Sequence, residues 1–506
     1  MKIKNVKYFL AVLSLGLFSC DSYLDINDNP NQIPVEKITP NLQLPGAMVA
    51  AHRVQAVTMN VLGNIWMQNW GGDVNNFTGV NIEEYNLQLN NNFYNGIWDG
   101  IYPAVANFEA IINFNSPDYD NHKAVAYILK SYYMQYVVDM YGDAPYSQAF
   151  KGQENPTPTY DDDKVIYRDL ITNIDKAIAL FNGANSTDVA MGASDVIFQG
   201  SVSNWIRFAN TLKLKILLRH TRLTDAETTT YLTEQFATIQ NGPFLTANAV
   251  INPGYNRTVA ASMNPFYSIF FNTAGNGTQT YNSTRATKYI SDFLNGESPL
   301  TSGPALIDPR RGALYTLVNN GSGNKVAGAT QGLTSWPEDN LSQIGPGLFR
   351  DIIAGMAGGN ESSLVISLAE TKFLIAEAIE RSFIPGNAKS EFDAGISASM
   401  TYLGAAPGTY LTAINGRPSL GWNAGTNIES IMTQKWLALN SINGLESFID
   451  YTRTGFPNIP LATTAQFPNR PRRLLYPTSE LVANSANVPS VSLNQIFVQG
   501  PFWYNN

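Results

Sequence analysis

The feature that most constrains the fold is a series of long segments in which apolar residues recur at helical spacing. In one of them Trp205, Phe208 and Leu212 fall on a single face, as expected for a helix packed on a core. The sequence therefore predicts an all-α, mainly helical protein. Helices are expected over residues 44–70, 93–114, 122–141, 163–181, 201–219, 362–382, 388–403 and 427–439.

The order of these segments predicts how they pack. Successive helices of about twenty residues joined by short loops favour stacked hairpins similar to tetratricopeptide repeats, although the consensus of that repeat is missing. Asp163 and Ser201 are expected to cap two of the helices. Between about residues 246 and 359, glycine, asparagine, serine and proline dominate, and only 284–294 is expected to be helical. We expect this loop-rich insertion to cover the helical scaffold and to hold binding residues.

The N-terminus indicates export. Three lysines precede an apolar run over residues 8–18, which is too short to span a bilayer but suits a signal peptide. The run ends at Cys20, the only cysteine in the chain, in a pattern that resembles a bacterial lipobox. We expect residues 1–19 to be a lipoprotein signal peptide, 20–40 a lipid anchor and polar tether, and 41–506 a single domain. The alternative is a plain signal peptide with an accidental cysteine.

The charge balance excludes one class of partner. Charged residues make up 14% of the chain, against about 25% in an average soluble protein, and the formal net charge is −8. Removing residues 1–19 deletes three lysines and no acid, so the mature chain is more acidic still. Without a basic patch to neutralise phosphates, a nucleic-acid partner is not expected. A neutral polar surface rich in aromatic residues suits uncharged, hydroxyl-rich ligands.

Several stretches are specific enough to indicate a family. They are residues 139–149, 205–215, 434–438, 451–457 and 472–477, with 25–31 behind the lipobox. Together they resemble the SusD/RagB family of nutrient-binding lipoproteins of Bacteroidota, and more narrowly its second SusD-like branch. Most of these residues suit structural roles: Gly142 and Pro145 end a helix. Arg453, Arg472 and Arg473 are expected to pair with Glu446, with Glu480 or with backbone carbonyls.

The resemblance implies a function of capture and delivery. Members of the family lie on the outer face of the outer membrane, held by a lipid anchor, and cap a SusC-like TonB-dependent barrel transporter. Their helical half faces the barrel, and the irregular half presents aromatic and polar side chains to oligosaccharides or, in some members, to peptides. The implied partners are therefore the transporter, an oligosaccharide and the membrane. A peptide-capturing member and a surface scaffold that binds no ligand are the alternatives.

Candidate ligand-binding residues follow from the shape of sugars. A sugar ring offers an apolar face and hydroxyl edges, which suit aromatic platforms flanked by polar side chains. Trp70 and Phe77 are the expected platforms, with further candidates at Asn69, Asn75, Asn76, Tyr281, Arg285 and Trp336. The competing interpretation places tryptophans in the core, and it is favoured for Trp66, Trp98, Trp205 and Trp436; for Trp70 and Trp336 both interpretations remain open.

The sequence contains none of the common catalytic motifs that we sought. The nucleophile elbow, the His-Glu-x-x-His metal motif and the phosphate-binding glycine loops are all missing from the sequence. The three histidines lie in separate segments, so neither a metal site nor a cofactor is expected. Asp161, Asp162 and Asp163 could suggest calcium, but their place before a helix favours capping. A glycosidase carboxylate pair is the open alternative, because its separation is not visible in sequence.

Overall fold

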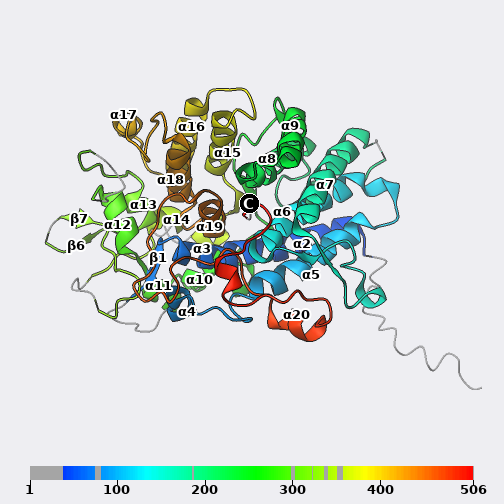
Figure 1. The fold of residues 1–506 in the computed structure, drawn as a ribbon, viewed down its shortest axis with the longest axis horizontal. Coiled ribbons are helices and arrows are strands. Elements are labelled where there is room, and N and C mark those ends of the chain that lie inside the picture. Colours follow the sequence, from blue (N-terminus) through cyan, green and yellow to red (C-terminus); the bar gives the residue numbers. More distant parts are fainter. Residues whose placement is uncertain are drawn as a thin grey trace, which may run out of the picture.

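Helices dominate the computed structural model (Figure 1), and its strands are short, which confirms the expected all-α class. The structure describes residues 38–73, 81–184, 187–297, 303–321, 323–335, 340–349 and 357–504. The expected signal peptide, Cys20 and nearly all of the tether lie outside these residues. No helix in the described part of the chain is long and apolar enough to cross a membrane.

The first described helices form one continuous rod. Helix α2 (Pro40–Val54) begins at a proline, whose missing amide costs nothing at the first helical position. A π-helical turn, η3 (Gln55–Met59), joins it to α3 (Asn60–Trp66) without a break in helical backbone angles. The expected helix over 44–70 therefore ends at Trp66, and residues 70–72 form a strand instead.

Helical hairpins make up one side of the molecule, where neighbours in sequence pack side by side (Figure 1). Their helices are α5 (Gly96–Ile112), α6 (Asp120–Tyr141), α7 (Asp163–Gly183), α8 (Val202–Arg219) and α9 (Ala226–Ile239). Ser201 caps α8 as expected, because its hydroxyl accepts from the amide of Asn204. The cap of α7 is Asp162, not Asp163: the Asp162 carboxylate accepts from the amide of Val165 at 3.1 Å.

A second helical group lies beside the hairpins. Its members are α15 (Leu368–Glu380), α16 (Ala388–Leu403), α17 (Tyr410–Ile414), α18 (Asn427–Leu439) and α19 (Gly444–Thr454). Helix α20 (Thr478–Ala483) lies instead below α5, where the Ser479 hydroxyl donates to Asp99 (Figure 1). The expected helix over 362–382 is wrong at its start, where β8 (Ser363–Ile366) pairs antiparallel with β4 (Ala249–Ile251). A short apolar run such as this, buried along its whole length, fits a strand or a helix equally well.

The expected loop-rich insertion contains many short elements. They are α10 (Pro265–Phe270), α11 (Gln279–Ser283), β5 (Thr284–Ala286), α12 (Lys288–Asn295), α13 (Arg311–Leu314), β6 (Val318–Asn319), β7 (Asn324–Lys325), α14 (Pro346–Phe349) and η9 (Ala357–Asn360). Strand β1 (Trp70–Gly72) pairs antiparallel with β5, so the helix expected over 284–294 begins only at Lys288, after its cap Thr287. The remaining elements are α4 (Ile82–Asn86), β2 (Ala144–Pro145) and β3 (Tyr160–Asp161).

Buried charges join the two helical groups. Arg219 of α8 forms ion pairs with Asp139 of α6 and with Glu446 and Asp450 of α19. Arg453 pairs with Glu377 at 2.6 Å and with Asp450 at 3.1 Å, so the expected pairing with Glu446 or Glu480 is wrong. Burial alone would raise the pKa of Glu446, but the cations around it, Arg219 first, hold that pKa well below its usual range.

Candidate functional site

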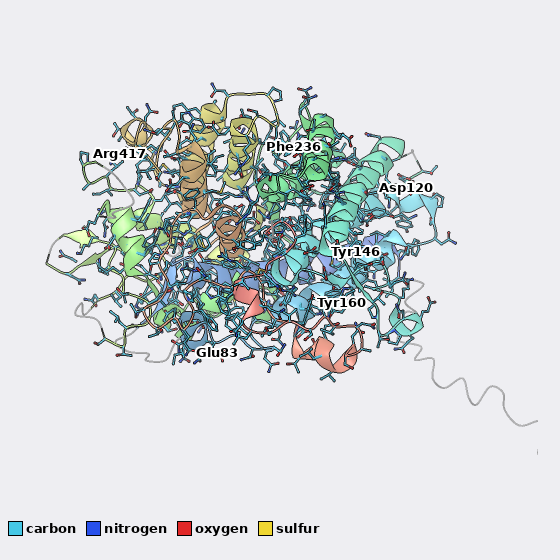
Figure 2. The ribbon with its side chains drawn as sticks, in the orientation of Figure 1. Glu83, Asp120, Tyr146, Tyr160, Phe236 and Arg417 are labelled. Carbon is cyan, nitrogen blue, oxygen red and sulfur yellow. The ribbon has the colours of Figure 1, made fainter. Side chains whose placement is uncertain are left out.

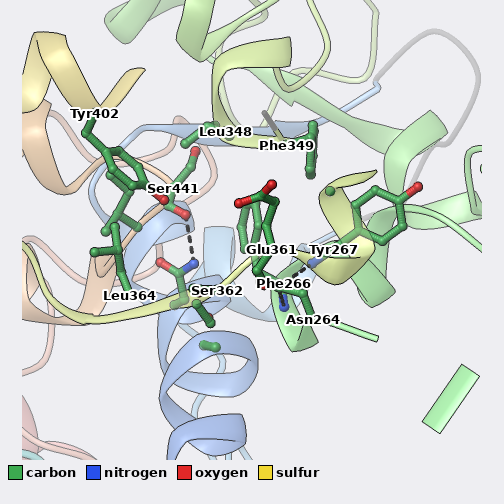
Figure 3. Close-up of a pocket in the computed structure, with 15 residues that line it drawn as sticks. Asn264, Phe266, Tyr267, Leu348, Phe349, Glu361, Ser362, Leu364, Tyr402 and Ser441 are labelled. Carbon is green, nitrogen blue, oxygen red and sulfur yellow. Dashed lines mark hydrogen bonds between the residues drawn. The ribbon is translucent and has the colours of Figure 1, made fainter. Parts of the chain in front are cut away.

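An aromatic pocket lies where the insertion meets α3 and the end of α16 (Figure 3). Its cavity volume is about 40 Å³, enough for a substituent of a ligand and too small for a whole sugar ring. Rings and polar groups both line it, as sugar recognition requires. The aromatic lining consists of Phe266, Tyr267, Phe349 and Tyr402, and the polar lining includes Asn60, Asn264, Glu361, Ser362, Ser363 and Ser441.

Asn264 organises one wall of the aromatic pocket. Its side-chain oxygen caps α10 by accepting from the amides of Phe266 and Tyr267, and Pro265 follows at the first helical position. The side-chain amide of Asn264 donates to the backbone carbonyl of Glu361 at 2.9 Å. The same residue therefore fixes both the rings of α10 and the backbone that carries Glu361.

The aromatic wall is one part of a larger cluster of rings. Phe266 stacks on Phe349 with ring centres 5.6 Å apart, and Tyr267 meets Phe349 edge-on at 6.2 Å. Trp70 lies behind Phe266, at 6.4 Å, and contacts Phe270 edge-on at 5.5 Å. Aromatic pairs at these distances stabilise one another, so the rings are held rigidly. Phe266 is half-buried, whereas Tyr267 and Phe349 are 3% and 2% exposed.

The opposite wall comes from α3 and the turn before α19. The Asn60 side-chain amide donates to the carbonyl of Ser441 at 3.0 Å, and its oxygen accepts from the amide of Gly444 at 2.9 Å. Ser363 shares a 2.7 Å hydrogen bond with buried His52. These groups are engaged within the fold, whereas no hydrogen bond or ion pair in the described part of the chain reaches the Glu361 carboxylate. Glu361 is therefore the polar side chain best placed to meet a ligand.

A glycine-rich pocket of about 590 Å³ lies on the other side of Tyr402, which lines both cavities. Helices α13, α14 and α16 approach closely here: a Cβ atom on Gly347 would lie 2.6 Å from Ala313 and 2.8 Å from the carbonyl of Leu403. Small residues thus allow these helices to pack closely beside the pocket, and the volume of the pocket matches ordinary ligand sites. The lining residues are Pro309, Gly312, Ala313, Pro346, Gly347, Thr401, Tyr402, Leu403, Gly404 and Ala405.

A third cavity, the α5–α7 groove, has a volume of about 540 Å³ and includes Tyr127 and Tyr146 in its lining. Figure 2 shows Tyr146 on the hairpin side of the molecule. Two charged groups of the groove are bound within the protein: Lys130 pairs with Glu109 at 2.7 Å, and Asp169 accepts from the Tyr146 hydroxyl at 2.8 Å. We therefore place the candidate site at the aromatic and glycine-rich pockets.

The expected platform Trp70 is a core residue in this structure. It is 2% exposed, and its indole N–H donates to the hydroxyl of Ser441 at 2.8 Å. Asn69 is fully buried and donates to the side chain of Asn64 at 2.9 Å. Both side chains are held behind the pocket lining and offer no surface to a sugar. Phe77, Asn75, Asn76 and Trp336 lie outside the described residues.

Tyr281 and Arg285 lie in the layer behind the aromatic pocket. Tyr281 is half-buried, and its ring centre lies 4.6 Å from that of Phe271 and 6.3 Å from that of Phe349. Arg285 pairs with Asp73 at 2.7 Å across the β1–β5 sheet. Trp70, Tyr281 and Arg285 thus lie one layer behind the residues that line the aromatic pocket.

Sequence reasoning missed five lining residues: Phe266, Tyr267, Phe349, Glu361 and Tyr402. A signal for the first two was present, because an asparagine cap and a proline stand directly before an aromatic-rich segment. For the other three no local pattern exists, since long-range packing alone brings them to the pocket.

The three aspartates before α7 act on backbone amides. Asp161 accepts from the amides of Tyr146 and Ser147, and Asp163 accepts from the amide of Phe502 at 2.7 Å. Oxygens of Asp143, Asp162 and Asp163 lie within 4.8 Å of one another. Burial, with Asp143 and Asp162 nearby, raises the pKa of Asp163 to about 7. Through these contacts the carboxylates cap α7 and stabilise the turns beside it.

We expect the stability of the fold to fall in mild acid through His52, behind the pocket. Burial lowers the pKa of His52 from 6.5 to about 4, so between these values the unfolded chain binds a proton that the folded chain does not. The free energy of unfolding therefore decreases as the pH falls through that window. The free energy of unfolding, measured with urea at about pH 6.5 and at about pH 4, should differ less between the two pH values in His52→Gln than in the unaltered protein. An unchanged difference would contradict the assignment to His52.

Comparisons with known proteins agree with this architecture. A family model named SusD-like_2 and described as "Starch-binding associating with outer membrane" matches residues 34–477. A chitin-binding SusD homologue from Flavobacterium johnsoniae has 21% identity and a TM-score of 0.69, covering 92% of this chain and 99% of its own. A SusD homologue from Parabacteroides distasonis has 20% identity and a TM-score of 0.72, with 92% and 98% covered. These identities show a shared fold. No curated protein matches the chain significantly in sequence.

Proposed function

Since the chain belongs to the SusD-like_2 family of starch-binding proteins that associate with the outer membrane, we propose that it captures oligosaccharides at the cell surface. A lipid on Cys20 holds it to the outer membrane, and it delivers its ligand to a SusC-like TonB-dependent transporter. We place capture at the aromatic pocket and the adjoining glycine-rich pocket.

The observation that carries this proposal is the composition of the two adjoining pockets. Tyr402 stands between a small cavity walled by rings and a larger one lined by glycine, alanine and proline. A sugar stacks its apolar face on a ring and satisfies its hydroxyls with nearby polar groups. The chitin-binding relative from Flavobacterium johnsoniae has the same fold, which favours a glycan as the nutrient.

The site favours binding without chemical change. Hydrolysis of a glycosidic bond uses two carboxyl groups placed on either side of that bond. Among the described residues that line the two pockets, Glu361 is the only acid. We therefore propose that the protein relays its ligand intact and uses no cofactor.

Residues outside the lining have supporting roles in this proposal. Trp70 and Tyr281 hold the rings of the pocket from behind, and Asn69 and Arg285 fix the strand and turn on which they stand. Phe77, Asn75, Asn76 and Trp336 stay candidates for ligand contact on the evidence of their sequence context.

The ligand class can be tested with the purified protein on glycan and peptide arrays. We expect saturable binding to one class of oligosaccharide, recovered intact with no new reducing ends. Binding to peptides alone would show that the ligand is a peptide and not a glycan. Released sugars would indicate an enzyme. No binding on either array would favour a surface scaffold. Copurification of a barrel transporter from outer-membrane extracts would support delivery, and its absence would count against it.

A further inference from the structure

One acidic side chain of the aromatic pocket has no partner among the described residues. Glu361 is half-buried, and its carboxylate projects into the pocket between Tyr402 and Phe349 (Figure 3). No hydrogen bond or ion pair within the described part of the chain reaches its carboxylate oxygens. Glu391, another half-buried acid, is by contrast paired with Lys372 at 2.8 Å. A negative charge is therefore left facing the cavity.

The backbone of Glu361 is held in place, so its side chain starts from a fixed position. Its carbonyl accepts from the Asn264 side chain at 2.9 Å, and its amide donates to the carbonyl of Gly358 at 3.3 Å. Gly358 must lack a side chain here, because a Cβ atom would lie 2.4 Å from the carbonyl oxygen of Phe349. The turn that carries Glu361 is thus packed directly against α10 and α14.

Four aromatic rings line the pocket into which this carboxylate projects. Phe266 and Phe349 are stacked with 22° between their planes, Tyr267 lies at 82° to Phe349, and Tyr402 forms the boundary with the glycine-rich pocket. Aromatic faces attract cations through the negative charge of their π-systems, and a carboxylate accepts charged N–H groups strongly. Rings and a carboxylate in one small cavity are the features that recognise an alkylammonium group.

We propose that the aromatic pocket binds the protonated amine of an amino sugar, so that the captured glycan carries free amino groups. This inference rests on the proposed function, because it names the ligand of the same site. The cavity of about 40 Å³ accepts the amino substituent, and the glycine-rich pocket of about 590 Å³ accepts sugar rings on the other side of Tyr402. Anionic glycans are disfavoured there, since their charge would meet Glu361.

The test uses three β-linked oligosaccharides of equal length that differ in one substituent. Glucosamine, N-acetylglucosamine and glucose oligomers carry an ammonium, an acetamide and a hydroxyl at the same carbon. At about pH 6, where an amine is protonated, we expect calorimetry to show about tenfold tighter binding of the glucosamine oligomer than of the glucose oligomer. Glu361→Gln should abolish this preference, and added salt should reduce it.

The matched control is Glu154→Gln, which makes the same charge change at an exposed residue of η5 (Gly152–Glu154), outside every cavity described above. It should keep the preference for the amine. Equal or tighter binding of the glucose or acetylated oligomer to the unaltered protein would overturn the inference and leave glycan capture intact. The same holds if none of the three binds while other glycans do. Tighter binding of lysine-rich peptides than of the glucosamine oligomer would overturn the glycan assignment as well.

Discussion

Arg219→Met is expected to lower the free energy of unfolding by about 3–5 kcal/mol, because it leaves the buried Asp139 carboxylate without a cation and removes one cation from Glu446 and Asp450. The Arg219 guanidinium lies 2.7 Å from Glu446, 3.1 Å from Asp450 and 3.3 Å from Asp139, and all four side chains are at most 5% exposed. Lys215 and Lys435 would still reach Glu446, but among the described residues Asp139 has no other ion-pair partner. Denaturant unfolding followed by circular dichroism measures the loss.

Lys389→Met provides the matched control for Arg219. Its ion pair with Asp393 joins side chains that are 41% and 32% exposed on α16. Water screens such a pair, so its loss is expected to cost about 1 kcal/mol at most. If Arg219→Met were no more destabilising than Lys389→Met, the buried network would not be what holds the two helical groups together.

Gly63→Ala is expected to lower the free energy of unfolding by about 3 kcal/mol or more, or to prevent folding, although it adds a single methyl group. Helices α3 and α19 approach backbone to backbone at this position. An alanine Cβ at Gly63 would lie 1.9 Å from the carbonyl carbon of Gly444 and 2.0 Å from the amide nitrogen of Leu445. Neither atom can move without displacing a helix, so the strain cannot be relieved by a side-chain rotation.

Gly46→Ala adds the same methyl group where space is open. Gly46 is exposed in α2, and no atom lies within 4 Å of the position that its Cβ would take. Because alanine favours a helix over glycine, this change is expected to raise stability by about 0.5–1 kcal/mol. The midpoint temperature of thermal unfolding should therefore fall in Gly63→Ala and rise in Gly46→Ala. A rise in Gly63→Ala would show that the close approach of α3 and α19 is not required.

Helices were predictable from sequence wherever one periodic pattern governed a whole segment. The expected helices over 388–403 and 427–439 coincide with α16 and α18, and that over 163–181 ends two residues before α7 does. The failures occur where a strand stands next to a helix in the chain, at β1 after α3 and at β5 and β8 before α12 and α15. Those strands are set by pairing of β1 with β5 and of β4 with β8, which lie far apart in sequence, and periodicity contains no information about such partners.

The candidate site was less predictable than the fold. An aromatic and asparagine-rich segment did indicate the region of Trp70, but this tryptophan is buried because its indole meets Ser441, 371 residues later in the chain. The lining itself joins α3, α10, α14, the turn before β8 and the end of α16. Its residues share no local pattern, and each becomes a candidate only once the insertion is folded over the helical scaffold.

The most direct test of capture at these pockets is a calorimetric titration of the oligosaccharide selected on the array. It compares the unaltered protein with Tyr402→Ala and Tyr127→Ala, after thermal unfolding has shown that both variants are folded. Both tyrosines are half-buried, but Tyr402 separates the two proposed ligand pockets, and Tyr127 lines the α5–α7 groove. We expect Tyr402→Ala to weaken binding by about tenfold or more and Tyr127→Ala to leave it unchanged. Unchanged binding in Tyr402→Ala together with loss in Tyr127→Ala would move the site to the groove and contradict the proposal.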